Sequence, residues 1–137
     1  MIRISELSFG NIVKIGDNIH RVIEIYGNKD MVRLNGREFT TYTVDLEPVP
    51  ITDGILHKNG FKNISDRIDR EIDNFESLYE LNDNVVLGKH DDTFEICYEH
   101  FNGEWDVYDH HPVLAMKYIH ELQNTLKDLR IYKMIIL

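Results

Sequence analysis

Residues 94–109 read FEICYEHFNGEWDVYD and predict a β-hairpin. Asn102-Gly103 readily adopts the positive φ angles of a two-residue turn, and β-branched and aromatic residues flank it on both sides. Such a turn places Phe101 opposite Glu104 and fixes the register of the two strands. We therefore expect an antiparallel sheet in this half of the chain.

The predicted hairpin has one acidic and one apolar face. In this register Glu99 lies opposite Asp106, and like charges that face each other destabilise a sheet unless water or a partner compensates them. The acidic face supplies the candidate partner-binding residues, which are Glu95, Glu99, Glu104 and Asp106. The apolar face carries Phe94, Ile96, Tyr98, Trp105 and Val107.

The hairpin lies in the acidic part of a chain of 137 residues with a net charge of −9. Residues 63–112 contain fourteen acidic and three basic side chains, whereas residues 1–62 contain eight of each. An acidic segment repels phosphate, which argues against nucleic-acid binding by the whole chain. Three interpretations stay open: a solvated face, a docking surface for a basic partner, and a surface that imitates nucleic-acid phosphates.

The first 50 residues contain short apolar runs separated by turn residues, which predicts an SH3-like small β-barrel or a curled sheet. Asn35-Gly36 indicates a hairpin with a two-residue turn in this region. Its register pairs Val32 with Phe39, and we expect both side chains to lie in the core.

We predict three segments along the chain: an SH3-like β module over residues 1–50, a linking helix over residues 51–62, and an acidic α+β region over residues 63–137. Thr52 is placed to cap the linking helix, and Gly60 suits the left-handed residue that ends it.

Helical spacing of apolar residues predicts two further helices. The first covers Ser65–Phe75. The second begins near Pro112 or Val113, and its apolar stripe is expected to pack on the hairpin around Trp105. The apolar tail, residues 131–137, is expected to be buried in the fold or else in a homo-oligomer. The fold class is therefore α+β: an N-terminal SH3-like small β-barrel followed by an antiparallel β-sheet packed by a C-terminal amphipathic helix.

No catalytic constellation or cofactor motif is recognisable, so we predict a non-enzymatic protein and identify no catalytic, metal or cofactor residue. Cys97 and His100 have the spacing of a zinc half-site, but residues three apart on a strand point to opposite faces. His120 and Asn124 occupy the ligand positions of a helical zinc-protease motif, in which asparagine is a poor ligand. A small metal-dependent or hydrolytic enzyme is the third functional hypothesis.

The second hypothesis is nucleic-acid binding by the N-terminal module. Basic side chains at Arg21, Lys29, Arg33 and Arg37 would form a small binding face there. Acidic residues in the same module dilute this charge, so a solvated surface is the simpler interpretation.

Several stretches together resemble a group of small proteins encoded by phages, prophages and mobile elements of Bacteroides-type bacteria. They are residues 9–13, 19–23, 44–52, 55–61 and 117–124. The resemblance covers about a third of the chain and leaves out residues 62–112. It implies a phage or mobile-element origin and a bacterial cytoplasmic setting, but it implies no activity and transfers no catalytic residue.

The remaining features agree with this setting. The lone Cys97 excludes an internal disulfide and is typical of a reducing cytoplasm. No apolar run is long enough to span a bilayer, and we expect no membrane association. We therefore predict a cytoplasmic, non-enzymatic interaction module whose acidic face binds a host or phage protein of basic character.

Overall fold

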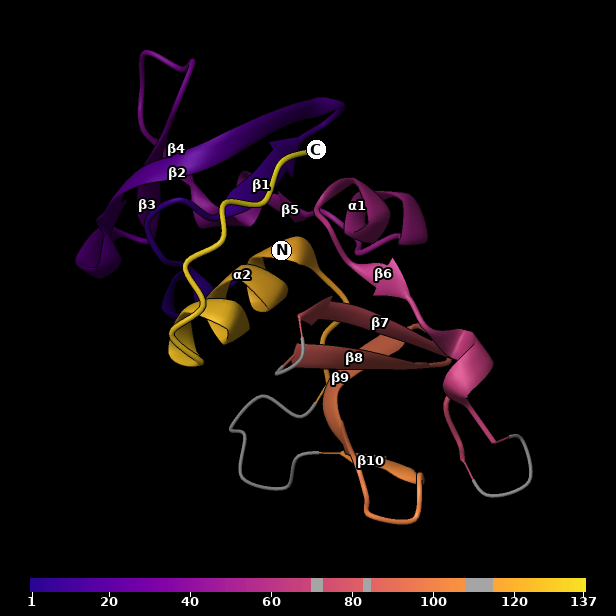
Figure 1. Ribbon diagram of the computed structural model, residues 1–137. Coiled ribbons are helices and arrows are strands. Elements are labelled where there is room, and N and C mark those ends of the chain that lie inside the picture. The colour runs from indigo at the N-terminus through magenta and orange to yellow at the C-terminus, as the bar shows by residue number, and fades with distance from the viewer. Residues whose placement is uncertain (70–72, 83–84, 108–114) are drawn as a thin grey trace. The chain divides into compact units, whose positions relative to one another are not determined.

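The protein is described here by a computed structural model, shown in Figure 1. The structure describes residues 1–69, 73–82, 85–107 and 115–137. Within them the chain forms two antiparallel sheets and two helices, which confirms the predicted α+β class.

The chain divides into two compact units. The first unit contains residues 1–50 and 118–133, and the second contains residues 51–117 and 134–137. Each unit has its own five-stranded sheet.

The sheet of the first unit has the strand order β4-β3-β2-β1-β5. Its strands are β1 (Ile12–Ile15), β2 (Asn18–Tyr26), β3 (Met31–Leu34), β4 (Thr41–Tyr42) and β5 (Glu47–Pro48). Three short 3-10 turns accompany them: η1 (Ile4–Glu6), η2 (Gly27–Lys29) and η3 (Thr43–Asp45). All residues of this unit are described, and no pairing joins β4 to β5, so the sheet does not close and the predicted SH3-like small β-barrel is not confirmed.

Tight turns and alternating apolar residues explain this sheet. Ile15 pairs with Asn18 across Gly16-Asp17, where Gly16 takes a φ of +58° that a residue with a Cβ rarely adopts. The inward positions form one buried cluster: Ile2, Leu7, Val13, Val22, Val32, Leu34 and Leu46.

The predicted register at Asn35-Gly36 is wrong. Val32 pairs with Thr41 instead of Phe39, and Phe39 is 74% exposed. β3 and β4 do form an antiparallel pair, but a longer loop joins them. Since Thr41 is buried opposite Val32, this register fills the core with a smaller side chain and leaves Phe39 in solvent.

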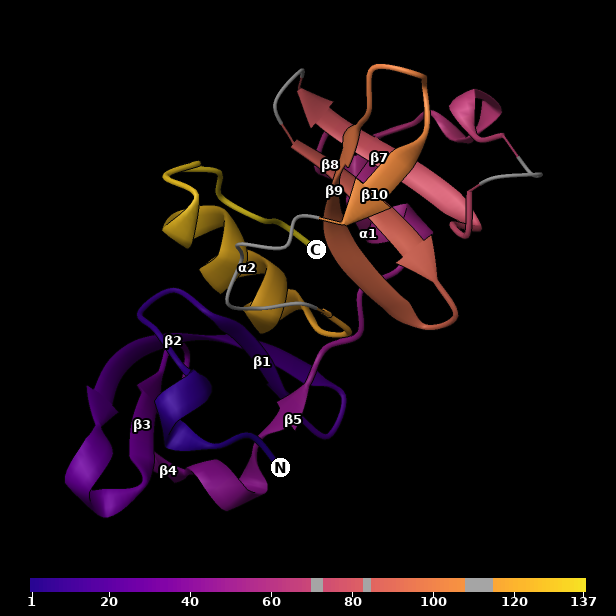
Figure 2. The same cartoon turned by 90° about the horizontal axis from the view of Figure 1, so that it is seen from below.

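Helix α2 (Ile119–Asp128) lies alongside β1 in the first unit, as Figures 1 and 2 show from two directions. The helix begins later than predicted, and the predicted start at Pro112 or Val113 lies outside the described residues. Met116 cannot be helical because its N–H and C=O both bond to Phe94. α2 belongs to the first unit, whereas Trp105 belongs to a buried cluster of the second, so the packing of α2 around Trp105 stays a prediction.

The sheet of the second unit has the order β10-β9-β8-β7-β6. Its strands are β6 (Lys62–Asn63), β7 (Ser77–Asn82), β8 (Val85–His90), β9 (Thr93–Glu99) and β10 (Trp105–Val107). Helix α1 (Asp53–Lys58) lies beside β6 (Figure 1) and confirms the predicted helix. Thr52 Oγ1 accepts a hydrogen bond from Ile55 N at 3.2 Å, and Gly60 ends the helix with a φ of +85°.

The helix predicted over Ser65–Phe75 is absent from the described part of that segment. A single 3-10 turn, η4 (Ser65–Arg67), is followed by extended backbone at Ile68, and residues 70–72 lie outside the described residues. Ser65 does not cap a helix, because its hydroxyl accepts a hydrogen bond from Leu78 N and fixes the turn to β7.

The hairpin of β9 and β10 is confirmed, but its register differs from the prediction by one residue. His100 N donates to the Glu104 carbonyl at 2.7 Å, so the turn contains three residues, Phe101–Gly103, and Trp105 lies opposite Glu99. A slip of one residue exchanges the two faces of a strand. Glu99 therefore does not lie opposite Asp106, and Trp105 shares a face with Glu99.

The C-terminal segment is part of the second unit from Met134 onward. Ile135 is buried, and the side chain of Asn59 donates to the Ile136 carbonyl and accepts from its N–H. The prediction that the tail is buried in the fold is thus confirmed at Ile135, whereas Tyr132 and Met134 are exposed. Homo-oligomerisation through the tail stays a prediction.

Candidate functional site

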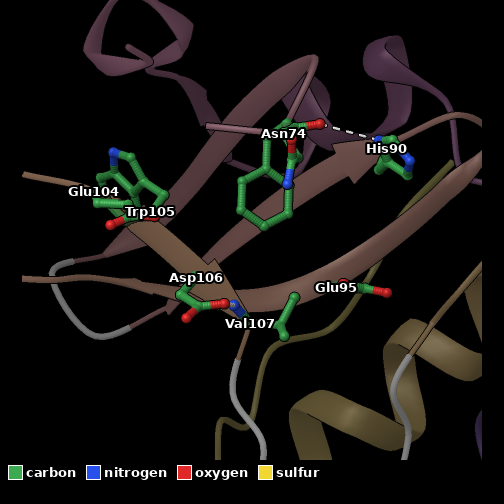
Figure 3. A pocket seen from close by; sticks show the side chains of 8 residues that line it. Asn74, His90, Glu95, Glu104, Trp105, Asp106 and Val107 are labelled. Carbon is green, nitrogen blue, oxygen red and sulfur yellow. Dashed lines mark hydrogen bonds between the residues drawn. The ribbon is translucent and has the colours of Figure 1, made fainter. Parts of the chain in front are cut away.

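A pocket of about 500 Å³ opens beside β10 in the second unit. Eight side chains line it: Asn74, Phe75, His90, Glu95, Glu104, Trp105, Asp106 and Val107. Figure 3 shows Glu104 and Trp105 on one side of the pocket, and His90 and Glu95 on the other. Aromatic and acidic groups are thus combined in one concave site, which is the usual shape of a ligand site in proteins.

The wall of the pocket depends on Gly88 of β8. A Cβ atom added at this position would lie 2.5 Å from the ring of Phe75, so the ring packs directly against the backbone. Gly88 lies opposite Glu95 in the register of β8 and β9. Phe75 and Glu95 are therefore neighbours on the same face of the sheet.

Asp73 holds the pocket strand in place. Its carboxylate is 8% exposed and accepts hydrogen bonds from Trp105 N and Asp69 N, both at 2.9 Å. A buried carboxylate needs such donors, because an unpaired one would be strongly unfavourable. Asp73 thus fastens the start of β10 to the segment that precedes β7.

Arg67 covers Trp105, which is 5% exposed. The guanidinium carbon lies 5.1 Å from the centre of the indole ring, and Nη2 donates to Glu99 at 2.6 Å. A second carboxylate, of Glu80, lies 3.6 Å from the same group. A guanidinium over an indole and beside carboxylates combines cation–π and ionic attraction.

Asp106 is paired within its own hairpin. It lies 3.2 Å from His100 Nε2, and the hydrogen bonds from His100 and from Val107 N lower the pKa of this carboxyl. His100 also packs edge-on against Tyr98. Glu99 and Asp106, two of the four predicted binding residues, are therefore engaged by other side chains.

The other two predicted residues are not engaged in this way. Within the described residues the carboxylates of Glu95 and Glu104 have no hydrogen-bond or ion-pair partner. Both line the pocket. The predicted acidic set thus separates into two internally paired acids and two unpaired acids at the pocket.

The edge of β10 does not offer free donors to an added strand. Trp105 N donates to Asp73, and Val107 N donates to the carboxylate of Asp106. Strand addition requires such main-chain donors, and occupied ones protect a sheet edge from it. The main-chain N–H groups of Trp105 and Val107 are therefore not free to pair with an added strand.

Phe101 stands out at the tip of the hairpin. It is entirely exposed, in the turn between Glu99 and Glu104. When an exposed aromatic side chain meets a partner, it commonly fills a pocket there and contributes much of the binding free energy.

Other reactive side chains near the pocket have structural roles. Cys97 is buried, and burial raises the pKa of its thiol to about 12, so it is a poor nucleophile. His90 Nδ1 donates to the Asn74 carbonyl at 3.0 Å (Figure 3). Across the described ranges, no three His, Cys, Asp or Glu side chains are grouped as metal ligands would be.

The four basic residues proposed for nucleic-acid binding occupy different settings. Arg21 donates to the Gly10 carbonyl at 3.3 Å, and Arg33 lies 3.7 Å from Glu24 in an exposed ion pair. Lys29 lies in η2, and Arg37 lies in the exposed loop before β4. These contacts do not specifically favour a nucleic-acid site.

The helical stretch around His120 positions the first unit's N-terminal loop. Gln123 donates to the Gly10 carbonyl at 3.0 Å and accepts from Ile12 N at 2.8 Å. Asn124 accepts from Asn11 Nδ2 and donates to the Glu6 carbonyl. Asn124, the second position of the motif that resembled a metal site, therefore serves with Gln123 as a hydrogen-bond anchor.

Comparison with family models, curated proteins and solved structures finds no match to this chain. Neither helix in the described residues is long and apolar enough to cross a membrane.

Proposed function

We propose that the second unit is a non-enzymatic interaction module that binds a basic partner protein through the β9–β10 hairpin. The observation that carries this proposal is Phe101, which is entirely exposed at the tip of an acidic hairpin. An exposed aromatic side chain is suited to fill a pocket on a partner, and such anchors dominate binding free energy.

The charge of the surrounding segment supports a basic partner. Residues 63–112 contain fourteen acidic and three basic side chains. Complementary charge accelerates association and favours correctly charged partners over others. Because Glu99 and Asp106 are already paired, Glu95 and Glu104 are the hairpin acids available to a partner.

The first unit is proposed to be an SH3-like module that supports this role. Its strand order, with β1 between β2 and β5, and the 3-10 turn η3 between β4 and β5 agree with that description. The resemblance to phage and mobile-element proteins directs the search for a partner to bacterial and phage proteins.

Selection from a displayed library of random peptides tests the proposal. The wild-type protein is expected to enrich peptides that contain basic residues, and added salt is expected to weaken their binding. Phe101→Ser and the double variant Glu95→Lys/Glu104→Lys are each expected to lose this binding.

A matched control distinguishes the loss of hairpin contacts from the effect of a changed net charge. Asp17→Lys/Asp92→Lys makes the same charge change at two exposed acids that do not line the pocket and is expected to keep the selected peptides bound. Enrichment without basic residues, or equal loss in the control and hairpin variants, would contradict the proposal.

A further inference from the structure

Two aromatic–carboxylate pairs lie on the same face of the second sheet. Trp105 and Glu99 form the first pair, because they lie opposite each other in the register of β10 and β9. Phe75 and Glu95 form the second, because Phe75 packs on Gly88 and Gly88 lies opposite Glu95. Glu95 and Glu99 share a face since residues separated by four positions on a strand point the same way.

The first pair binds a guanidinium from this chain. Arg67 lies over the indole of Trp105 and donates to Glu99 at 2.6 Å. The second pair has the same combination of groups, but Glu95 has no ion-pair partner within the described ranges. Glu95 lines the pocket together with Phe75.

We propose that the pocket binds an arginine side chain of the partner, with the guanidinium beside the Phe75 ring and paired with Glu95. This inference rests on the proposed function and names the residue that the partner inserts. Val107 and Trp105 line the same pocket and contact the aliphatic part of the arginine. Glu104, on the other side of the pocket, attracts the positive charge from a distance (Figure 3).

Arginine fits this site better than lysine for two reasons. Its planar guanidinium can pair with a carboxylate through two parallel hydrogen bonds and can stack on an aromatic ring at the same time. Its hydration is also weaker than that of an ammonium group, so entry into a partly apolar pocket is less costly.

Single amino acids with both ends capped, and therefore uncharged, test the site without a partner protein. N-acetyl-arginine methylamide is titrated into the full chain, and the indole N–H of Trp105, the single tryptophan, is followed by NMR. We expect a saturable shift, weaker binding by the lysine analogue, and no binding by the citrulline analogue, which has nearly the same shape without the charge.

Variants of the pocket locate the contact. Glu95→Gln is expected to weaken arginine binding about tenfold, as loss of one charge-assisted hydrogen bond does. Phe75→Leu is expected to remove the preference for arginine over lysine. Glu104→Gln is expected to have a smaller effect than Glu95→Gln, and Asp92→Asn, an exposed acid outside the pocket, no effect.

Each outcome is decisive for the pocket. No saturable shift, equal binding by arginine and citrulline, or equal losses in Glu95→Gln and Asp92→Asn would overturn the inference. Loss of peptide binding in Phe101→Ser together with absent fragment binding would leave the hairpin as an interaction surface and reject only the arginine pocket. Fragment binding without any selected peptide would leave the arginine pocket in place and reject the hairpin as an interaction surface.

Discussion

The two units of this protein use their polar side chains differently. In the first unit Gln123 and Asn124 form hydrogen bonds that fasten the N-terminal loop to α2. In the second unit Asp73 has a similar fastening role, but Glu95 and Glu104 line a pocket and have no hydrogen-bond or ion-pair partner among the described residues. Carboxylates that line a concave site are suited to a basic ligand, which supports the proposed binding role of the second unit.

The largest effect is expected from Asp73→Ala, which removes the acceptor for Trp105 N and Asp69 N. Loss of both hydrogen bonds, with the buried Trp105 N left without an acceptor, should lower the free energy of unfolding by about 3 kcal/mol. Urea unfolding followed by the fluorescence of Trp105 measures this. Asp92→Ala, at an exposed turn, should change the value by less than about 0.5 kcal/mol, and equal effects of the two variants would reject the role of Asp73.

A smaller loss, about 2 kcal/mol, is expected from Gln123→Ala in the first unit, since two hydrogen bonds to the Gly10–Ile12 segment are lost. Amide hydrogen exchange at Ile12 and Val13 should accelerate, while exchange in β8 should not. Acceleration in both sheets would show that the two units open together.

The stability of the first unit should depend on pH through His120, which is 2% exposed. Burial lowers the pKa of His120 from its ordinary 6.5, against smaller opposing contributions from Glu121 and Glu6. The His120 imidazole therefore takes up a proton more readily in the unfolded chain than in the folded chain. The free energy of unfolding consequently falls as the pH decreases through 6.5. His120→Gln should flatten this dependence in urea titrations at several pH values, whereas His57→Gln should not.

The smallest effect concerns Cys97, the single cysteine, which lies in the second unit. Its thiol has a pKa of about 12, so labelling by a neutral thiol reagent at pH 8 should require opening of this unit. Asp73→Ala should accelerate labelling, and Gln123→Ala should leave its rate near the wild-type value. Equal acceleration of labelling by the two variants would contradict the expectation that the two units open separately.

Local signals in the sequence predicted local structure well. Thr52 and Gly60 lie at the two ends of α1 and act on their own helix, so its position followed from sequence. Both Asn-Gly pairs identified antiparallel strand pairs, but neither register was right. Asn-Gly fits loops of several lengths, and the choice depends on burial against residues far away in the chain.

The candidate site also depends on contacts between residues far apart in the chain, which the sequence alone does not indicate. Charge patterning identified Glu95 and Glu104, but it grouped them with Glu99 and Asp106, whose partners come from the tertiary fold and from the corrected register. Arg67, Asp73 and Phe75 were missed because their segment has helical spacing of apolar residues. The packing of Phe75 on Gly88 and the hydrogen bond from Trp105 N to Asp73 bring that segment to the pocket, and no sequence pattern indicates these contacts.

A double-mutant cycle between the protein and a selected peptide tests the central claim most directly. Binding is measured for wild-type protein and Glu95→Gln, each with the peptide carrying arginine or citrulline at its basic position. If the arginine pairs with Glu95, the two changes should be coupled by about 1 kcal/mol or more, because either one alone removes the same contact. Additive effects would show that the basic residue binds elsewhere and would contradict the account.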